Sequence, residues 1–257
     1  MNKIRFFYPA KLLHIVVSFG VFLGLWQLIV SIGNFNQALL PTPTAALAAL
    51  WELIIDGTLI SHIGASMYRF ALGYLSAVIV AIPLGLLFGR FKTLFLYVNP
   101  VIQLLRPVSP LAWLPFIVLW FGIGDLPAAI IIFIATFFPV LLATVSAVNH
   151  IDPVYYKVAA NFEIKGLPLI YKVVLPASFP QIAAGLRLAL GAAWVFLVCG
   201  EMAGPQSGLG YLIVDARNNL RADILAADIL VIGFIGLMLD SSLRFIEKSI
   251  LKSWGHA

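Results

Sequence analysis

Long apolar stretches dominate this chain, and six of them reach the length of a membrane-spanning helix. A helix needs about 20 residues to cross about 30 Å of hydrocarbon. The stretches run from Leu12 to Ile32, Phe70 to Gly89, Leu94 to Gly122, Leu126 to Val148, Pro180 to Glu201 and Ile224 to Phe245. Since no linker marks a boundary between them, the pattern predicts an all-α polytopic membrane protein with about six transmembrane helices in a single transmembrane domain over residues 1–257.

Composition supports a membrane protein. Hydrophobic residues make up 62% of the chain and charged residues 11%, with a mean hydropathy of +1.03. Soluble domains contain about 25% charged residues, so this chain is too apolar for that class.

Most basic residues fall on one side of the membrane if the six spans alternate in direction, and the loops on the other side contain only Arg217 and Arg221 as cations. The majority precede the first span, follow the second and fourth, and end the chain: Lys3, Arg5, Lys11, Arg90, Lys92, Lys157, Lys165, Lys172, Arg244, Lys248 and Lys252. Because loops rich in Lys and Arg stay in the cytoplasm, we expect both termini to be cytoplasmic. The net charge of +5 is therefore a signal of topology and does not indicate a nucleic-acid partner.

A polar segment from Asp152 to Lys172 interrupts the apolar pattern. Asp152 suits a helix N-cap and Pro153 the first helical position, and the stripe expected next has helical spacing: Tyr155, Val158, Ala159 and Phe162. Gly166 and Pro168 are expected to stop this helix after about three turns, and Leu175-Pro176 to redirect the chain into the fifth span. We expect the helix to lie in a cytoplasmic loop of about 150–178 and to fill a groove on a water-soluble partner.

The third span contains four prolines, which follow Asn99, Arg106, Ser109 and Leu114. Each proline removes a backbone donor and clashes with the preceding turn, so this span should be broken or kinked. Irregular backbone at membrane depth needs protein or a watery cavity around it. Arg106 at that break is a candidate for a translocation pathway, because a guanidinium inside a helix costs about 2.5 to 3.5 kcal/mol on insertion. A structural tie to helix-end carbonyls or a carboxylate, or snorkelling to the surface, is the alternative.

Three other polar or aromatic positions are weaker candidates. Glu201 ends the fifth span and is a gate candidate, or an ordinary helix-end carboxylate. Trp113 is a pathway candidate, or a packing aromatic. Arg187 lies a few turns into the fifth span. Its charge is explained more simply if the side chain snorkels, that is, extends to the membrane surface.

Two elements are expected on the outer face. Residues Pro41 to Asp56 predict an amphipathic helix with Leu47, Leu50, Trp51 and Ile54 on one stripe, which either lies in the membrane interface or packs on the protein. Gly204 to Gly210 form a turn-rich loop. No Lys-Ser or Lys-Thr pair follows these glycines, so a phosphate-binding P-loop is excluded and loop geometry explains them.

No arrangement of residues predicts catalysis or a metal site. The single cysteine, Cys199, excludes a disulfide framework and a cysteine metal site. The four histidines are scattered, without metal-ligand spacing. We therefore expect a non-catalytic protein that binds no metal and no cofactor.

The chain resembles the inner-membrane permease subunits of binding-protein-dependent ABC transporters. The hallmark of that family is a cytoplasmic loop with Glu-Ala-Ala, three residues, Gly, and a Leu-Pro pair some dozen residues later. Ala159, Leu175 and Pro176 agree with it, whereas Lys157, Val158 and Glu163 depart from it. The stretches LPTPTAALAAL, RPVSPLAWLPFIVLWFGIGD, FFPVLLATVSAV, VVLPASFPQIAAGLRLALGAAWVFLVCGEM and SGLGYLIVDAR resemble the branch that imports taurine, aliphatic sulfonates, nitrate or bicarbonate.

The resemblance implies a set of partners. Two permease subunits, here expected to be a homodimer, would form the pathway in the bacterial inner membrane, in contact with its lipids. Two separate ATPases would bind ATP, and an external binding protein would deliver a small solute, such as an anion. The residues implied in coupling to the ATPase are Tyr155, Val158, Ala159, Phe162, Glu163, Leu175 and Pro176. An ATP-independent secondary transporter or channel is the alternative function; it would share the spans but have no use for a docking helix.

Overall fold

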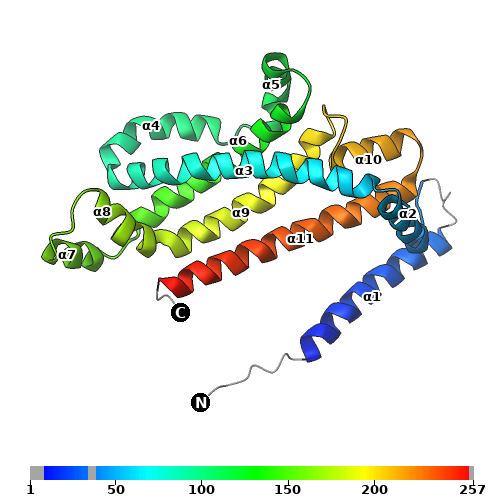
Figure 1. The fold of residues 1–257 in the computed structure, drawn as a ribbon, viewed down its shortest axis with the longest axis horizontal. Helices are drawn as coiled ribbons and strands as arrows, with labels where there is room; N and C mark the ends of the chain where they lie inside the picture. Colours follow the sequence, from blue (N-terminus) through cyan, green and yellow to red (C-terminus); the bar gives the residue numbers. More distant parts are fainter. Residues whose placement is uncertain (1–8, 34–38, 255–257) are drawn as a thin grey trace. The chain divides into compact units, whose positions relative to one another are not determined.

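All the regular structure in the described part of the chain is helical (Figure 1). The computed structural model describes residues 9–33 and 39–254. The helices are α1 (Pro9–Ile32), α2 (Pro43–Ile55), α3 (Thr58–Arg90), α4 (Lys92–Leu105), the 3₁₀ turn η1 (Pro110–Trp113), α5 (Leu114–Phe121), α6 (Asp125–Asn149), α7 (Pro153–Asn161), α8 (Leu167–Leu169), the π turn η2 (Ile170–Val174), α9 (Leu175–Glu201), α10 (Leu209–Asn218) and α11 (Ala222–Ser253). The all-α prediction is confirmed.

Four continuous helices within the described ranges are long and apolar enough to cross a membrane: α3, α6, the run Leu167–Glu201 and α11. A fifth span is possible if α4 and the helical stretch Pro110–Phe121, which are bent by 83°, count as one broken crossing. The first expected span, Leu12–Ile32, lies in α1, of which the stretch Val16–Ile32 is apolar but shorter than the others. The multi-pass architecture is thus confirmed, whereas the number six is not.

The break in the third expected span lies where the prolines predict it. α4 ends at Leu105, and residues 106–109 separate it from η1. Arg106 and Pro107 follow α4 directly, and Pro110 begins η1. The sharp bend confirms the prediction that these prolines interrupt the helix.

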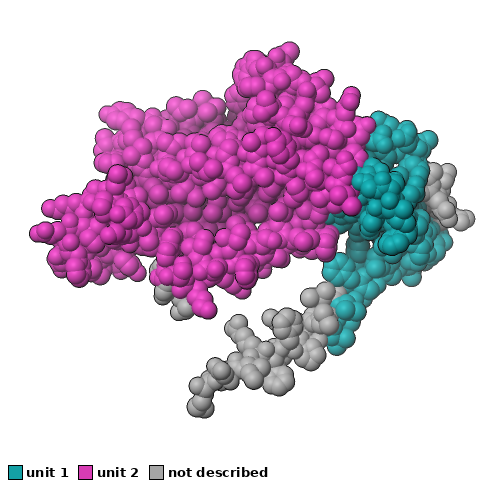
Figure 2. Space-filling view, viewed as in Figure 1, with its two compact units in different colours: residues 1–59, 212–231 teal, residues 60–211, 232–257 magenta. Residues whose placement is uncertain are grey.

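The described chain forms two compact units, residues 1–59 with 212–231 and residues 60–211 with 232–257 (Figure 2). In the second unit, α6 and α9 pack along each other. Near residue 150 the core of this unit is a cluster of buried side chains: Leu86, Ala147, Val148, Ile151, Val174 and Ile182.

Small residues let α3 approach α6 closely. Every fourth residue of α3 over residues 73–89 is Gly or Ala: Gly73, Ala77, Ala81, Gly85 and Gly89. A Cβ on Gly73 would lie 2.4 Å from the Ala129 carbonyl oxygen, and one on Gly85 2.5 Å from the Thr144 Cβ. Residues four apart lie on one helix face, and in a membrane close backbone contact contributes to helix association. This stripe therefore sets the α3–α6 contact.

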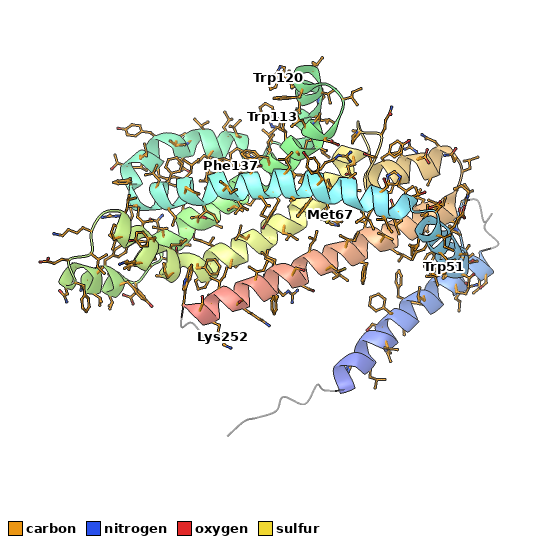
Figure 3. All side chains as sticks on the ribbon, viewed as in Figure 1. Trp51, Met67, Trp113, Trp120, Phe137 and Lys252 are labelled. Atoms are coloured by element: carbon orange, nitrogen blue, oxygen red, sulfur yellow. The ribbon has the colours of Figure 1, made fainter. Side chains whose placement is uncertain are left out.

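The first unit contains the helix predicted near the interface. The Thr42 hydroxyl caps α2 by accepting from the Ala45 N–H. The buried residues of α2 are Pro43, Ala46, Ala49 and Leu53. Of the predicted stripe, Leu47, Trp51 and Ile54 are exposed and Leu50 is half-buried; Trp51 is labelled in Figure 3. The predicted apolar stripe thus lies beside the packed face, and an exposed face of this composition is typical of a helix in a membrane interface.

Candidate functional site

α7 is the helix that the polar segment predicts, and its start is confirmed. The Asp152 carboxylate accepts a hydrogen bond from the Val154 N–H at 2.8 Å, and Pro153 occupies the first turn, where a missing N–H costs nothing. The predicted N-terminus was therefore correct.

α7 ends earlier than predicted. The Glu163 N–H donates to the Ala160 carbonyl at 3.0 Å, and the Ile164 N–H donates to the Ala159 carbonyl at 2.9 Å. Glu163 itself adopts φ = 57°. These two bonds around a left-handed residue form the Schellman cap that ends many helices. Gly166 and Pro168 do not stop this helix; they begin the next one, α8.

The left-handed residue of this cap is the position that the family hallmark assigns to glycine. Glu163 departs from the hallmark but has the backbone conformation for which glycine is best suited. A residue with a Cβ in that conformation costs about 1–2 kcal/mol. The departure thus leaves the turn geometry intact and strains one residue.

Three of the four residues expected on the apolar face of α7 are exposed, whereas Ala159 is buried. Val158 is 48% exposed and Phe162 73% exposed, and Tyr155 is similarly open. Ala159 is only 2% exposed, because α7 packs against the π turn Ile170–Val174 of the same chain. Ala159 therefore holds α7 in place, and the other three side chains form an apolar face that no described residue covers.

A groove of about 420 Å³ runs beside this face. Val158, Phe162 and Ile164 line it together with Pro176 and Trp254. The Trp254 ring meets Phe179 edge-on at 4.9 Å. The end of α11 thus contributes to the same surface as α7.

The expectation that Leu175-Pro176 redirects the chain was wrong. The chain continues without a break from Leu167 to Glu201, and the π turn Ile170–Val174 comes directly before Leu175. A wider turn accommodates a proline, whose nitrogen cannot donate in the helix ladder. The Ser178 hydroxyl donates to the Val174 carbonyl at 2.7 Å and so helps to satisfy this irregular turn.

A second feature is a cavity of about 300 Å³ at the break between α4 and η1. Residues 106–110 line it together with Phe138 of α6 and Phe196 of α9. Arg106 is exposed and, among the described residues, forms no ion pair. The proposed tie between Arg106 and a nearby carboxylate is therefore not present there.

Trp113 and Arg187 are not among the residues that line this cavity. Trp113 ends η1 and is half-buried (Figure 3). Arg187 donates to Glu247 of α11 at 2.5 Å. It is thus paired across two helices, which explains its position without snorkelling.

A third feature, which sequence reasoning missed, is a buried ionic cluster around Arg69 of α3. Arg69 is 1% exposed. Its Nη1 donates to Glu201 Oε1 and to the Ser207 carbonyl, each at 2.7 Å, and its Nε donates to Asp125 at 2.7 Å. The cluster joins α3, the start of α6, the end of α9 and the loop that follows α9.

Glu201 is fully enclosed in this cluster. Its carboxylate accepts from the Ser66 hydroxyl at 2.8 and 2.9 Å and from the Gly210 N–H at 3.0 Å. Gly208 has φ = 106°, and a Cβ there would lie 2.3 Å from Glu201 Oε1. Gly208 thus serves loop geometry, as predicted for this glycine-rich segment, and its missing side chain makes room for the carboxylate. A sequence signal existed: an arginine in an apolar helix, with carboxylates at the ends of two later helices.

Comparison with known proteins decides the family. A protein family described as "Binding-protein-dependent transport system inner membrane component" matches residues 77–252. That range includes the broken span, α7 and its cap, and α9. The chain belongs to this family. It is a transmembrane permease subunit of an ABC-type importer.

Curated relatives align over nearly the whole permease. A putative aliphatic sulfonates transport permease of Bacillus subtilis is 38% identical, over 91% of this chain and 84% of the relative. A nitrate import permease of Leptolyngbya laminosa is 36% identical and the taurine transport system permease of Escherichia coli 32% identical, each over 91% of this chain and 86% of the relative. The resemblance stated from sequence is confirmed.

The ionic cluster yields a test that compares its two carboxylates. Glu201→Gln in the permease should destabilise the fold by about 3–5 kcal/mol, because it leaves the buried Arg69 without its enclosed counter-charge. Asp125→Asn should cost at most about 1 kcal/mol, because the Asp125 side chain is 54% exposed. Thermal unfolding in detergent measures both; equal losses would contradict the assignment of Glu201 as the structural partner.

Proposed function

We propose that the permease forms the translocation pathway for a small oxyanion, is driven by a separate ATPase that docks on α7, and receives its solute from an external binding protein. Membership in the family implies these two kinds of partner. The observation that supports the ATPase site best is α7 itself. It is a capped helix outside the spans, with three large apolar side chains, Tyr155, Val158 and Phe162, left uncovered.

The assembly we propose contains two copies of the permease. In the complete transporter, two α7 helices would then meet two ATPase subunits. ATP binding and hydrolysis belong to those partners, and the permease contributes a contact surface and a pathway.

The coupling proposal is tested by a charge on the uncovered face. Val158→Arg should leave the permease folded, because Val158 is already half-exposed, but should place an unpaired guanidinium in the ATPase contact. We expect at least a tenfold loss of ATPase retention on purification and of stimulated ATP hydrolysis, about 1.4 kcal/mol or more. The measurement is co-purification with the ATPase, with permease stoichiometry from light scattering.

The controls separate docking from folding. Lys165→Ala, on an exposed residue outside α7, should retain the ATPase. Ala159→Arg should lower the amount of folded permease, because Ala159 is buried within the chain. Normal retention and transport by Val158→Arg would rule out α7 as the docking helix.

We further propose that both termini and α7 lie in the cytoplasm. The positive charges around residues 90–92 and 157–172 support this orientation. In a Cys199→Ser background, a cysteine at Asp56 should react with an impermeant thiol reagent added to whole cells, and a cysteine at Lys165 should not. Labelling of the Lys165 position from outside would reverse the topology.

The proposed solute class rests on Arg106 and on the relatives. The Arg106 guanidinium faces a cavity at a broken helix without a carboxylate partner in the described chain, so it can attract an anion. Three relatives are named for the transport of aliphatic sulfonates, taurine and nitrate. Sulfonate and nitrate groups each have three oxygen atoms, two of which can accept hydrogen bonds from one guanidinium.

Replacement of Arg106 separates a transport role from a structural one. Arg106→Gln should lower ATP-driven uptake of sulfonate, taurine or nitrate into proteoliposomes by about tenfold while the yield of folded protein stays unchanged. Arg187→Gln is the contrast, because it breaks an ion pair between α9 and α11 and should lower the folded yield. If Arg106→Gln lowers folded yield and uptake equally, Arg106 has a structural role. Uptake by the wild-type protein without ATP would favour a secondary transporter or channel.

A further inference from the structure

A cavity of about 270 Å³ lies at the corner where α3 ends and α4 begins, beside the base of α7. The residues that matter here are Gly89, Arg90, Lys92, Asn149, Pro153 and Tyr156. They come from four segments of the unit that contains residues 60–211. The proposed ATPase contact uses other residues of α7, and the Arg106 cavity lies at the opposite end of α4.

The charge lining this cavity is positive. Arg90 and Lys92 are both exposed, and neither forms an ion pair with another described residue. No carboxylate lines the cavity. The nearest acidic residue in sequence, Asp152, caps α7 through the Val154 N–H. Two cations therefore face the cavity without a partner in the described chain.

Neutral hydrogen-bond donors complete the lining. Asn149 contributes an amide, and burial raises the pKa of the Tyr156 phenol, an effect that the nearby Arg90 charge partly offsets. Tyr156 is therefore protonated at neutral pH and can donate to an anion. A Cβ on Gly89 would lie 2.6 Å from the Val148 Cβ, so α3 and α6 are closely packed where these two residues line the cavity.

The surface next to the cations is apolar. Phe91 and Leu94, on either side of Lys92, are exposed, and Leu87 in the last turn of α3 is exposed as well. These residues belong to, or directly join, two membrane-spanning stretches. A ligand that places a phosphate between Arg90 and Lys92 would thus find hydrocarbon-compatible surface on its other side.

We propose that this cavity binds the phosphate headgroup of an anionic phospholipid. Arg90 and Lys92 supply the charge, Asn149 and Tyr156 supply hydrogen bonds, and the acyl chains lie against Phe91 and Leu94. Basic pockets between helices at the cytoplasmic surface suit such headgroups. A free phosphate would satisfy the cations but would leave the apolar residues unused.

The position of the site gives the lipid a structural role. Pro153 and Tyr156 belong to α7, whereas Gly89 and Arg90 end α3. A headgroup between them would bridge the corner of two spans to the base of α7. Lipid composition would then affect how firmly α7 is held, whichever partner its apolar face contacts.

The test measures lipid retained by the full-length permease in detergent, by native mass spectrometry with added phosphatidylglycerol or phosphatidylcholine. The wild-type chain should retain phosphatidylglycerol in preference to phosphatidylcholine. The double variant Arg90→Gln/Lys92→Gln should weaken that retention by at least about tenfold, because each cation near a membrane surface contributes to anionic lipid binding. Tyr156→Phe should weaken it by a smaller factor.

Matched variants decide the outcome. Lys165→Gln/Lys172→Gln removes the same charge from the neighbouring segment, outside the cavity, and should keep wild-type retention. Thermal unfolding without added lipid should be equal for both double variants. Equal retention of phosphatidylglycerol by both would overturn the proposal. Displacement of the lipid by millimolar inorganic phosphate would also overturn it, because the site would then select a free anion.

Discussion

Burial of the Arg69 guanidinium is the constraint on which the larger unit depends. A charge cannot remain in an apolar interior without a counter-charge and filled hydrogen-bonding positions. The chain meets this need with Glu201 from α9 and Asp125 from α6, which fixes where those two helices end and begin relative to α3. The approach of Glu201 depends in turn on the missing side chain of Gly208. A loop glycine and the contact of three spans are thus parts of one arrangement.

The same face of α3 extends that arrangement along the membrane. Arg69 is followed at every fourth residue by the stripe of small residues from Gly73 to Gly89. The Arg69 side chain and the close contact with α6 are therefore on the same face of α3. An arginine and glycines look unrelated in the sequence. In the structure Arg69 fixes α3 near its first third, and the glycines let the following part of α3 approach α6.

Local chemistry explains what the sequence predicted well. Apolar length predicts α3, α6, α9 and α11, the Asp152 carboxylate predicts the start of α7, and clustered prolines predict the break after α4. Each of these depends on a few adjacent residues. The failures depend on distant ones. Ala159 is buried because of the π turn that follows α7, and the pairing of Arg69 with Glu201 joins residues far apart in the chain.

Proline shows why such failures arise. The residue is equally unable to donate at every position, yet Pro107 lies in a break, Pro168 begins a helix, and Pro176 lies in a continuous one after a π turn. What differs is whether the preceding turn can widen and whether other groups satisfy the freed carbonyl. That is decided by packing, which the pattern of one segment does not contain.

The cap of α7 has a consequence for the variation that this loop can accept. Segments between spans usually tolerate inserted or deleted residues. Here Asp152 fixes one end of α7, and the bonds at Glu163 and Ile164 fix the other. One added residue would rotate the following side chains by about 100° around the helix axis, which would move Ala159 away from its buried position. The number of residues between Asp152 and Glu163 is therefore as strictly set as the composition of the spans on either side.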